Sequence, residues 1–153
     1  MNMSNIDIAL DEARRKLDFQ AQQIDGLDTK SGIILGADGV LIALFIPIIS
    51  THSNLINEIL VKIALIPIFI SLVLSLVSLS NIKFNNPPNL NRLWSHYVPL
   101  EDSSETKLEI TKAMISAVSE NEKPIKVKSN LWRYSYISLS ISIGMLLVLA
   151  FIL

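Results

Sequence analysis

The sequence predicts an all-α membrane protein with three transmembrane helices, an N-terminal amphipathic cytosolic helix and a helical cytosolic region between the second and third spans. Half of the 153 residues are hydrophobic and 18% are charged, and the mean hydropathy is +0.46. The apolar residues are gathered into three blocks, and such a chain is too apolar for an ordinary soluble domain. The predicted segments are a leader over 1–30, spans over 31–50, 59–80 and 132–153, an external turn over 51–58 and a cytosolic region over 81–131.

The leader is predicted to be an amphipathic helix, because its apolar residues recur largely at three- and four-residue spacings. Packing on the rest of its own cytosolic part is the ordinary interpretation, and an interfacial or partner-binding helix is the alternative. Its several acidic residues argue against an anionic lipid surface as the partner. The apolar positions are Ile6, Ile8, Leu10, Ala13, Leu17, Ala21 and Ile24.

The first span carries a carboxylate, Asp38, about 10 Å into the bilayer at 1.5 Å per residue. A charged side chain at this depth usually faces protein or water and is by default a candidate functional residue. Gly32 and Gly36 form a small-xxx-small pair, which Gly39 extends. Because small residues let another helix approach closely, these three glycines are predicted to form a helix-packing face, together with Asp38.

Serines on the other two spans are predicted to lie at a depth similar to that of Asp38, spaced so that each set shares one helix face. The alternative is that they bond back to their own helix or allow tight packing. Three helices are few to enclose a carboxylate, so we predict a homo-oligomer in which several copies of the first span surround a common axis or a lateral groove. Ser75 and Ser138 are the predicted neighbours of Asp38. The two sets are Ser71, Ser75 and Ser78, and Ser135, Ser138 and Ser142; the predicted polar layer or pore comprises Asp38, Ser71, Ser75, Ser138 and Ser142.

The cytosolic region begins with a proline-containing turn over 85–89, and its helix is predicted to run from Asp102 or Ser103 to about Asn121, with a break or new first turn at Pro124. Aromatic and arginine side chains near its start suit stacking on a nucleotide and phosphate contact. The alternative for the aromatics is an interfacial belt. The possible ligand-binding residues are Arg92, Trp94, His96 and Tyr97.

The distribution of basic residues predicts the topology. Of thirteen Lys and Arg residues, four precede the first span and eight lie from Lys83 to Arg133. The positive-inside rule therefore places both polar regions and the N-terminus in the cytoplasm and the C-terminus outside.

Several function classes are disfavoured. The chain has no cysteine and two distant histidines, and it lacks catalytic triads, phosphate-binding glycine loops and zinc motifs. No enzyme activity, metal or cofactor is therefore expected. The net charge of −1 gives no basic field for nucleic acid.

A family resemblance is carried by five parts of the chain: the leader, the stretch DTKSGIILGADGVLIAL, the second span, the stretch ITKAMISAVSENEKPIKVKSNLWR and the final span. Together they resemble the small transmembrane effectors of bacterial anti-phage defence, particularly the Pycsar-type membrane effectors and the related SLATT-type proteins. Members often carry Asp-x-Lys before the first span, matched by Asp28 and Lys30. They also tend to carry an Asn and a Lys before the last span, comparable to Asn121 and Lys126 or Lys128.

The resemblance implies an oligomeric effector of the bacterial inner membrane that perturbs or permeabilises the bilayer on a cytosolic signal. These residues include no appended cyclic-nucleotide-binding domain, so the trigger is either a cyclic nucleotide or a cytosolic defence protein. Two other functions stay open from the residues: a membrane-anchored scaffold that recruits a cytosolic partner, and a small ion channel subunit.

Overall fold

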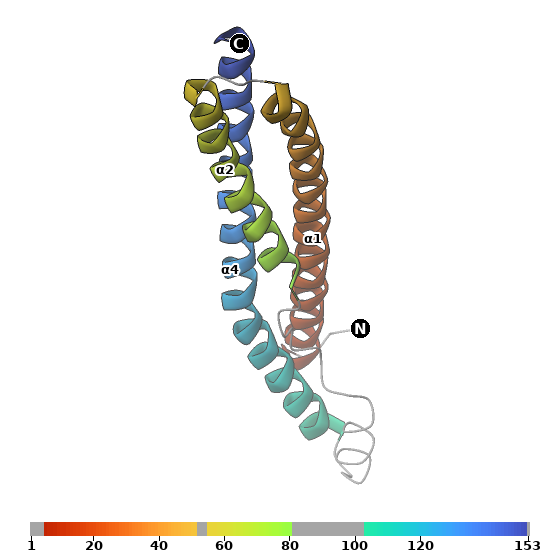
Figure 1. The fold of residues 1–153 in the computed structure, drawn as a ribbon. Helices are drawn as coiled ribbons and strands as arrows, with labels where there is room; N and C mark the ends of the chain where they lie inside the picture. The colour runs from red at the N-terminus through yellow and green to blue at the C-terminus, as the bar shows by residue number, and fades with distance from the viewer. Residues whose placement is uncertain (1–4, 52–54, 81–102, 153) are drawn as a thin grey trace. The chain divides into compact units, whose positions relative to one another are not determined.

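The computed structural model describes residues 5–51, 55–80 and 103–152, and these form three helices (Figure 1). Helix α1 spans Asn5–Thr51, α2 spans Leu55–Leu79 and α4 spans Ser103–Ile152. Each helix contains a stretch long and apolar enough to cross a membrane. The predicted all-α architecture with three apolar helices is therefore confirmed.

Helices α1 and α4 are longer than the predicted segments. They contain 47 and 50 residues, more than twice the roughly 20 that one crossing requires. The predicted boundaries at residues 30 and 131 fall inside these helices. Helix α1 therefore joins the leader to the first span without interruption. Helix α2 begins at Leu55, before the predicted start at residue 59.

The predicted break at Pro124 is also wrong, because this proline lies inside α4. Proline lacks the N–H that would bond to the carbonyl of residue 120, and an interior proline costs a helix about 3 kcal/mol. Buried residues flank it on both sides, since Asn121 is 1% exposed and Lys128 is 3% exposed. Packing at these positions keeps the helix continuous across the missing hydrogen bond.

The chain divides into two compact units. Unit 1 comprises Met1–Asp25 and Ile82–Val127, and unit 2 comprises Gly26–Asn81 and Lys128–Leu153. Helices α1 and α4 contribute to both units, whereas α2 belongs to unit 2.

Unit 1 has a small core between α1 and α4. Ala13 and Leu17 of the leader's apolar stripe pack with Met114 and Ala117, and all four side chains are buried. The Nε2 group of Gln20 donates a hydrogen bond of 3.0 Å to a backbone carbonyl of α4. The small alanine side chains let the two helices pack closely here.

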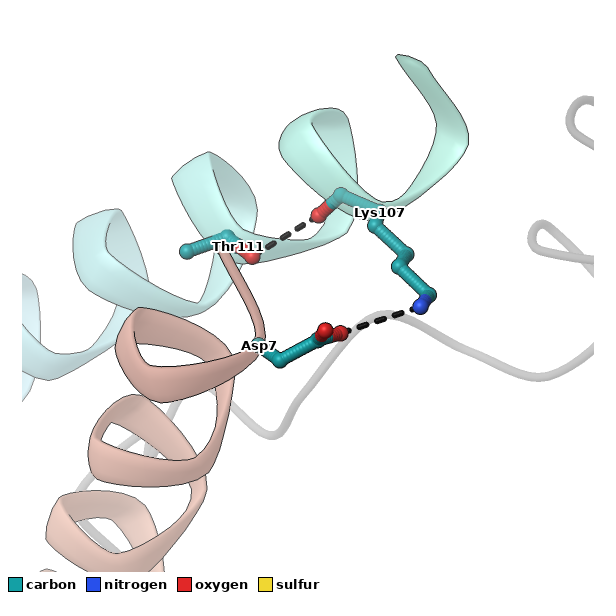
Figure 2. Close-up of polar contacts among 3 residues, drawn as sticks. All are labelled: Asp7, Lys107 and Thr111. Atoms are coloured by element: carbon teal, nitrogen blue, oxygen red, sulfur yellow. Dashed lines mark hydrogen bonds and ion pairs between the residues drawn. The ribbon is translucent and has the colours of Figure 1, made fainter. Parts of the chain in front are cut away.

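An ion pair joins the two helices of unit 1 near the start of each (Figure 2). Lys107 Nζ donates to Asp7 Oδ1 at 2.9 Å, and Thr111 Oγ1 donates to the Lys107 carbonyl at 2.7 Å. Both charged side chains are substantially exposed, and pairs of this kind contribute at most about 1 kcal/mol. The buried apolar residues are therefore the main stabilising contact of unit 1.

Candidate functional site

A hydrogen-bonded polar cluster joins the three helices of unit 2. Asp38 of α1 is fully buried, and its Oδ2 accepts a hydrogen bond of 2.9 Å from Ser71 of α2. The Ser71 Oγ also lies 3.2 Å from the Oγ of Ser135 of α4, which lies 2.6 Å from the Oγ of Ser75. One carboxyl and three hydroxyl groups thus form a continuous chain inside an apolar helix assembly.

Two reciprocal contacts hold α2 and α4 together within this cluster. The Ser71 Oγ lies 3.1 Å from the carbonyl oxygen of Ser135, and Ser135 Oγ donates to the carbonyl of Ser71 at the same distance. A hydroxyl group has one proton, so Ser71 donates either to Asp38 or to Ser135 at any moment. The cluster therefore has more than one compatible hydrogen-bond arrangement.

The sequence spacing explains why the serines converge. Residues three and four apart on a helix share a face, and all six serines of the two predicted sets are buried. Ser78 accepts a hydrogen bond of 2.9 Å from Ser31, Ser138 donates to the Pro67 carbonyl at 2.7 Å, and Ser142 donates to the Ser138 carbonyl at 3.0 Å. The back-bonding expected as an alternative occurs at Ser142, whereas the other serines bond between helices.

Two expectations about the surroundings of Asp38 are wrong. Its hydrogen-bond partner is Ser71 rather than Ser75 or Ser138, because Ser75 contacts Ser135 and Ser138 donates to the Pro67 carbonyl. Three helices also suffice to enclose it, since serines occupy little volume and Asp38 is fully buried within one copy of the chain. Among the described residues its Oδ1 atom has no hydrogen-bond partner.

The three glycines of the first span lie on a different face from Asp38. Gly32, Gly36 and Gly39 are exposed, and a Cβ atom built on each would meet no atom of a described residue within 4 Å. The expectation that they share the face of Asp38 is wrong, because Asp38 points into the helix assembly and the glycines point out of it. Their role in packing against another helix stays a prediction.

A second polar group lies in unit 2, and it includes residues that carry the family resemblance. Lys128 Nζ lies 2.5 Å from Asp28 Oδ1, and the lysine side chain is 4% exposed. The Nζ of Lys30 lies 5.0 Å from the ring centroid of Trp132, which stacks on Tyr136 at 6.1 Å. Asp28 and Lys128 each belong to a motif that carries the family resemblance, but nothing in the sequence indicates that the two residues pair.

The predicted ligand-binding residues Arg92, Trp94, His96 and Tyr97 lie outside the described residues. Within the described ranges, no group of three or more His, Asp or Glu residues could hold a metal ion. Among the described residues, the polar cluster around Asp38 is therefore the candidate functional site.

Replacing Ser135 with alanine should lower the stability of the protein. The change removes a hydroxyl group that contacts both Ser71 and Ser75, and hydrogen bonds between membrane helices contribute on the order of 1 kcal/mol. We expect the melting temperature in detergent to fall by about 2–4 °C. Ser140→Ala is the matched control, because that exposed hydroxyl bonds only to its own helix. Equal melting temperatures for both variants would contradict the assignment.

The comparison with protein families gives one match that covers nearly the whole chain. The model of the Pycsar effector protein domain, PycTM, matches residues 12–153. Neither the curated proteins nor the solved structures give a significant match. The matched range includes all of α2 and α4 and most of α1, so it contains unit 2 with its polar cluster and most of unit 1. The chain therefore belongs to the Pycsar effector family, a group of membrane effectors in anti-phage defence.

Proposed function

We propose that the protein is a non-enzymatic, oligomeric effector of the bacterial inner membrane that permeabilises the bilayer when it receives a cytosolic signal. The observation that carries this proposal is the buried cluster of Asp38, Ser71, Ser135 and Ser75 inside apolar helices. Membership of the Pycsar effector family supports the role in defence.

The energetic cost of the cluster argues for a functional role. Burying a carboxyl group with one oxygen unpartnered costs several kcal/mol relative to an apolar core. An apolar side chain at residue 38 would pack between the helices without this desolvation cost. Ionisable groups inside membrane helices commonly mark ion or proton paths, and a permeabilising effector requires such a path.

In the resting state, the polar groups bond to one another within each copy of the chain, and Asp38 Oδ1 has no partner among the described residues. In the proposed active state, the apolar packing beside Asp38 opens enough for water to reach its carboxyl group. Hydration then supplies a partner for the Oδ1 atom. The exposed glycine face of α1 supplies the contact between copies, because glycine permits close approach of a second helix.

The signal enters from the cytoplasm, where the positive-inside rule places the N-terminus and the region between the second and third spans. The trigger is either a cyclic nucleotide, with Arg92, Trp94, His96 and Tyr97 as the proposed contacts, or a cytosolic defence protein. Binding assays on the purified protein with a panel of cyclic nucleotides distinguish these triggers.

Inducible expression in bacterial cells with a membrane-potential dye tests the proposal. We expect the protein, supplied with its neighbouring genes and an activating signal, to depolarise the inner membrane before growth stops. Cells that stop growing with an intact membrane potential would instead favour a scaffold that recruits a toxic partner. A protein that never depolarises cells under these conditions would contradict permeabilisation.

A further inference from the structure

Towards one end of unit 2 the buried side chains become mainly apolar. We call this part the apolar section and the part that contains Asp38 the polar section. On α1 the buried Asp38 is followed two turns later by Phe45, and on α4 the buried Ser142 is followed two turns later by Leu149. On α2, which runs in the opposite direction, Ser71 follows the buried Ile68. The two sections overlap, because Ile34 and Leu139 are buried in the polar section and Ser138 donates to the carbonyl of Pro67, next to Ile68.

The apolar section contains a closed cluster, which we call the plug. It consists of Phe45, Ala64, Ile68 and Leu149, with exposures of 0%, 2%, 1% and 5%. The partly buried side chains that pack against it are also hydrophobic. Water is unstable in a narrow apolar constriction, so such a section stops the passage of water and ions without a covalent or charged barrier.

The polar section contains the continuous chain Ser75, Ser135, Ser71 and Asp38, with successive oxygen separations of 2.6, 3.2 and 2.9 Å. Hydroxyl groups donate and accept hydrogen bonds, so each can receive a proton as it releases its own. The far end is Asp38 Oδ1, which is buried and without a hydrogen-bond partner among the described residues. The chain therefore ends in a proton acceptor that points at no other donor.

We propose that the centre of each copy of unit 2 is a proton pathway and that the plug is its gate. This proposal deepens the proposed permeabilising function and rests on it, because it names the proton as the permeant and the plug as the point of control. It places the path inside one copy of the chain rather than between copies.

The transfer balances without any further reactant. A proton from water that reaches Ser75 enters the chain, and each hydroxyl passes its own proton to the next oxygen. Asp38 receives the last proton on Oδ2. The carboxyl group then turns so that the protonated oxygen meets water that enters when the plug opens, and the proton is released to that water. The carboxyl and hydroxyl groups rotate back, and the net change is the movement of one proton.

The short oxygen–oxygen distances along the chain allow a proton to pass and exclude a hydrated ion. Adjacent oxygens of the chain are in direct contact, so no water or metal ion fits between them in this conformation. An apolar groove of about 380 Å³, lined by residues of α2 and α4, adjoins Ala64 and Leu149 of the plug. It gives these side chains room to move and lets the plug open without separation of all three helices.

Reconstitution of the full-length protein into phosphatidylcholine and phosphatidylglycerol vesicles tests the gate. Vesicles contain either a pH-sensitive dye, with potassium and valinomycin to fix the potential, or calcein. The variant Phe45→Ala removes the largest plug side chain, and Phe151→Ala is the matched control because Phe151 is 91% exposed on α4. Leu149→Ser is a second plug variant for use if Phe45→Ala fails to fold, since loss of a buried phenyl group is strongly destabilising.

We expect the plug variant to conduct protons several-fold faster than wild type without a trigger and to retain calcein. The control should match wild type, and adding Asp38→Asn to the plug variant should return proton flux to the wild-type level. Unchanged flux in a folded plug variant, or calcein release together with proton flux, would overturn the proton pathway.

These outcomes are separable from those of the proposed function. Cells that depolarise, combined with calcein release from plug-variant vesicles, would leave the effector role standing and reject the proton pathway. Proton flux through the plug variant in vesicles, with no depolarisation of cells by wild type, would support the pathway and reject the effector role.

Discussion

Replacement of Asp38 with asparagine is expected to abolish depolarisation while leaving the amount of folded protein in the membrane unchanged. Asparagine has nearly the same volume as aspartate, and its amide oxygen can still accept the hydrogen bond from Ser71. It cannot carry the charge or exchange the proton that the proposed path requires. Depolarisation measured with a potential dye should therefore fall to the level of cells without the protein.

Stability should move in the opposite direction from activity in this variant. Among the described residues, one oxygen of the buried carboxyl group has no hydrogen-bond partner. The neutral amide therefore lowers the cost of burial, and the melting temperature should stay equal or rise. Asp11→Asn is the control, because Asp11 is an exposed acid on the same helix. If Asp38→Asn depolarises cells as wild type does, the carboxyl group has no part in permeation.

The pair of Asp28 and Lys128 should show a strong asymmetry between its two single variants. Lys128 is 4% exposed, whereas Asp28 is 37% exposed. Asp28→Asn leaves a buried ammonium group without its partner, which costs about 3–5 kcal/mol. Lys128→Met leaves a carboxylate that water still reaches, so its cost should be on the order of 1 kcal/mol.

Thermal unfolding in detergent measures this difference. We expect Asp28→Asn to lower the melting temperature by about 6–20 °C, at roughly 2–4 °C per kcal/mol for a chain of this size. The double variant Asp28→Asn with Lys128→Met should recover most of that loss, because the uncompensated charge is gone. A double variant as unstable as Asp28→Asn alone would show that the two side chains do not form the pair.

Local sequence patterns were sufficient to predict the three apolar stretches and the serine faces on two of them. The apolar blocks of α1, α2 and α4 are long enough to span a bilayer, and the serine spacing indicates one polar stripe on each of two helices. The interruption expected at Pro124 was wrong because proline's local preference was outweighed by buried residues on both sides of it.

The partners within the polar cluster could not be predicted in the same way. The depth of Asp38 suggested Ser75 and Ser138, but the structure pairs it with Ser71. Depth follows from a residue count along one helix, whereas pairing depends on how each helix is rotated about its axis and how far it is shifted against its neighbours. The pairing of Asp28 with Lys128 was beyond sequence reasoning for the same reason.

The sequence by itself determined that the chain forms three apolar helices with one buried acid and two serine faces, because helical period and hydropathy are properties of consecutive residues. Only the tertiary structure decided that Asp38 faces inward and Gly32, Gly36 and Gly39 face outward. It also decided that Ser71 of the polar chain lies one turn from Ile68 of the plug. Helix rotation is fixed by the packing of side chains from all three helices at once, and no single segment contains that information.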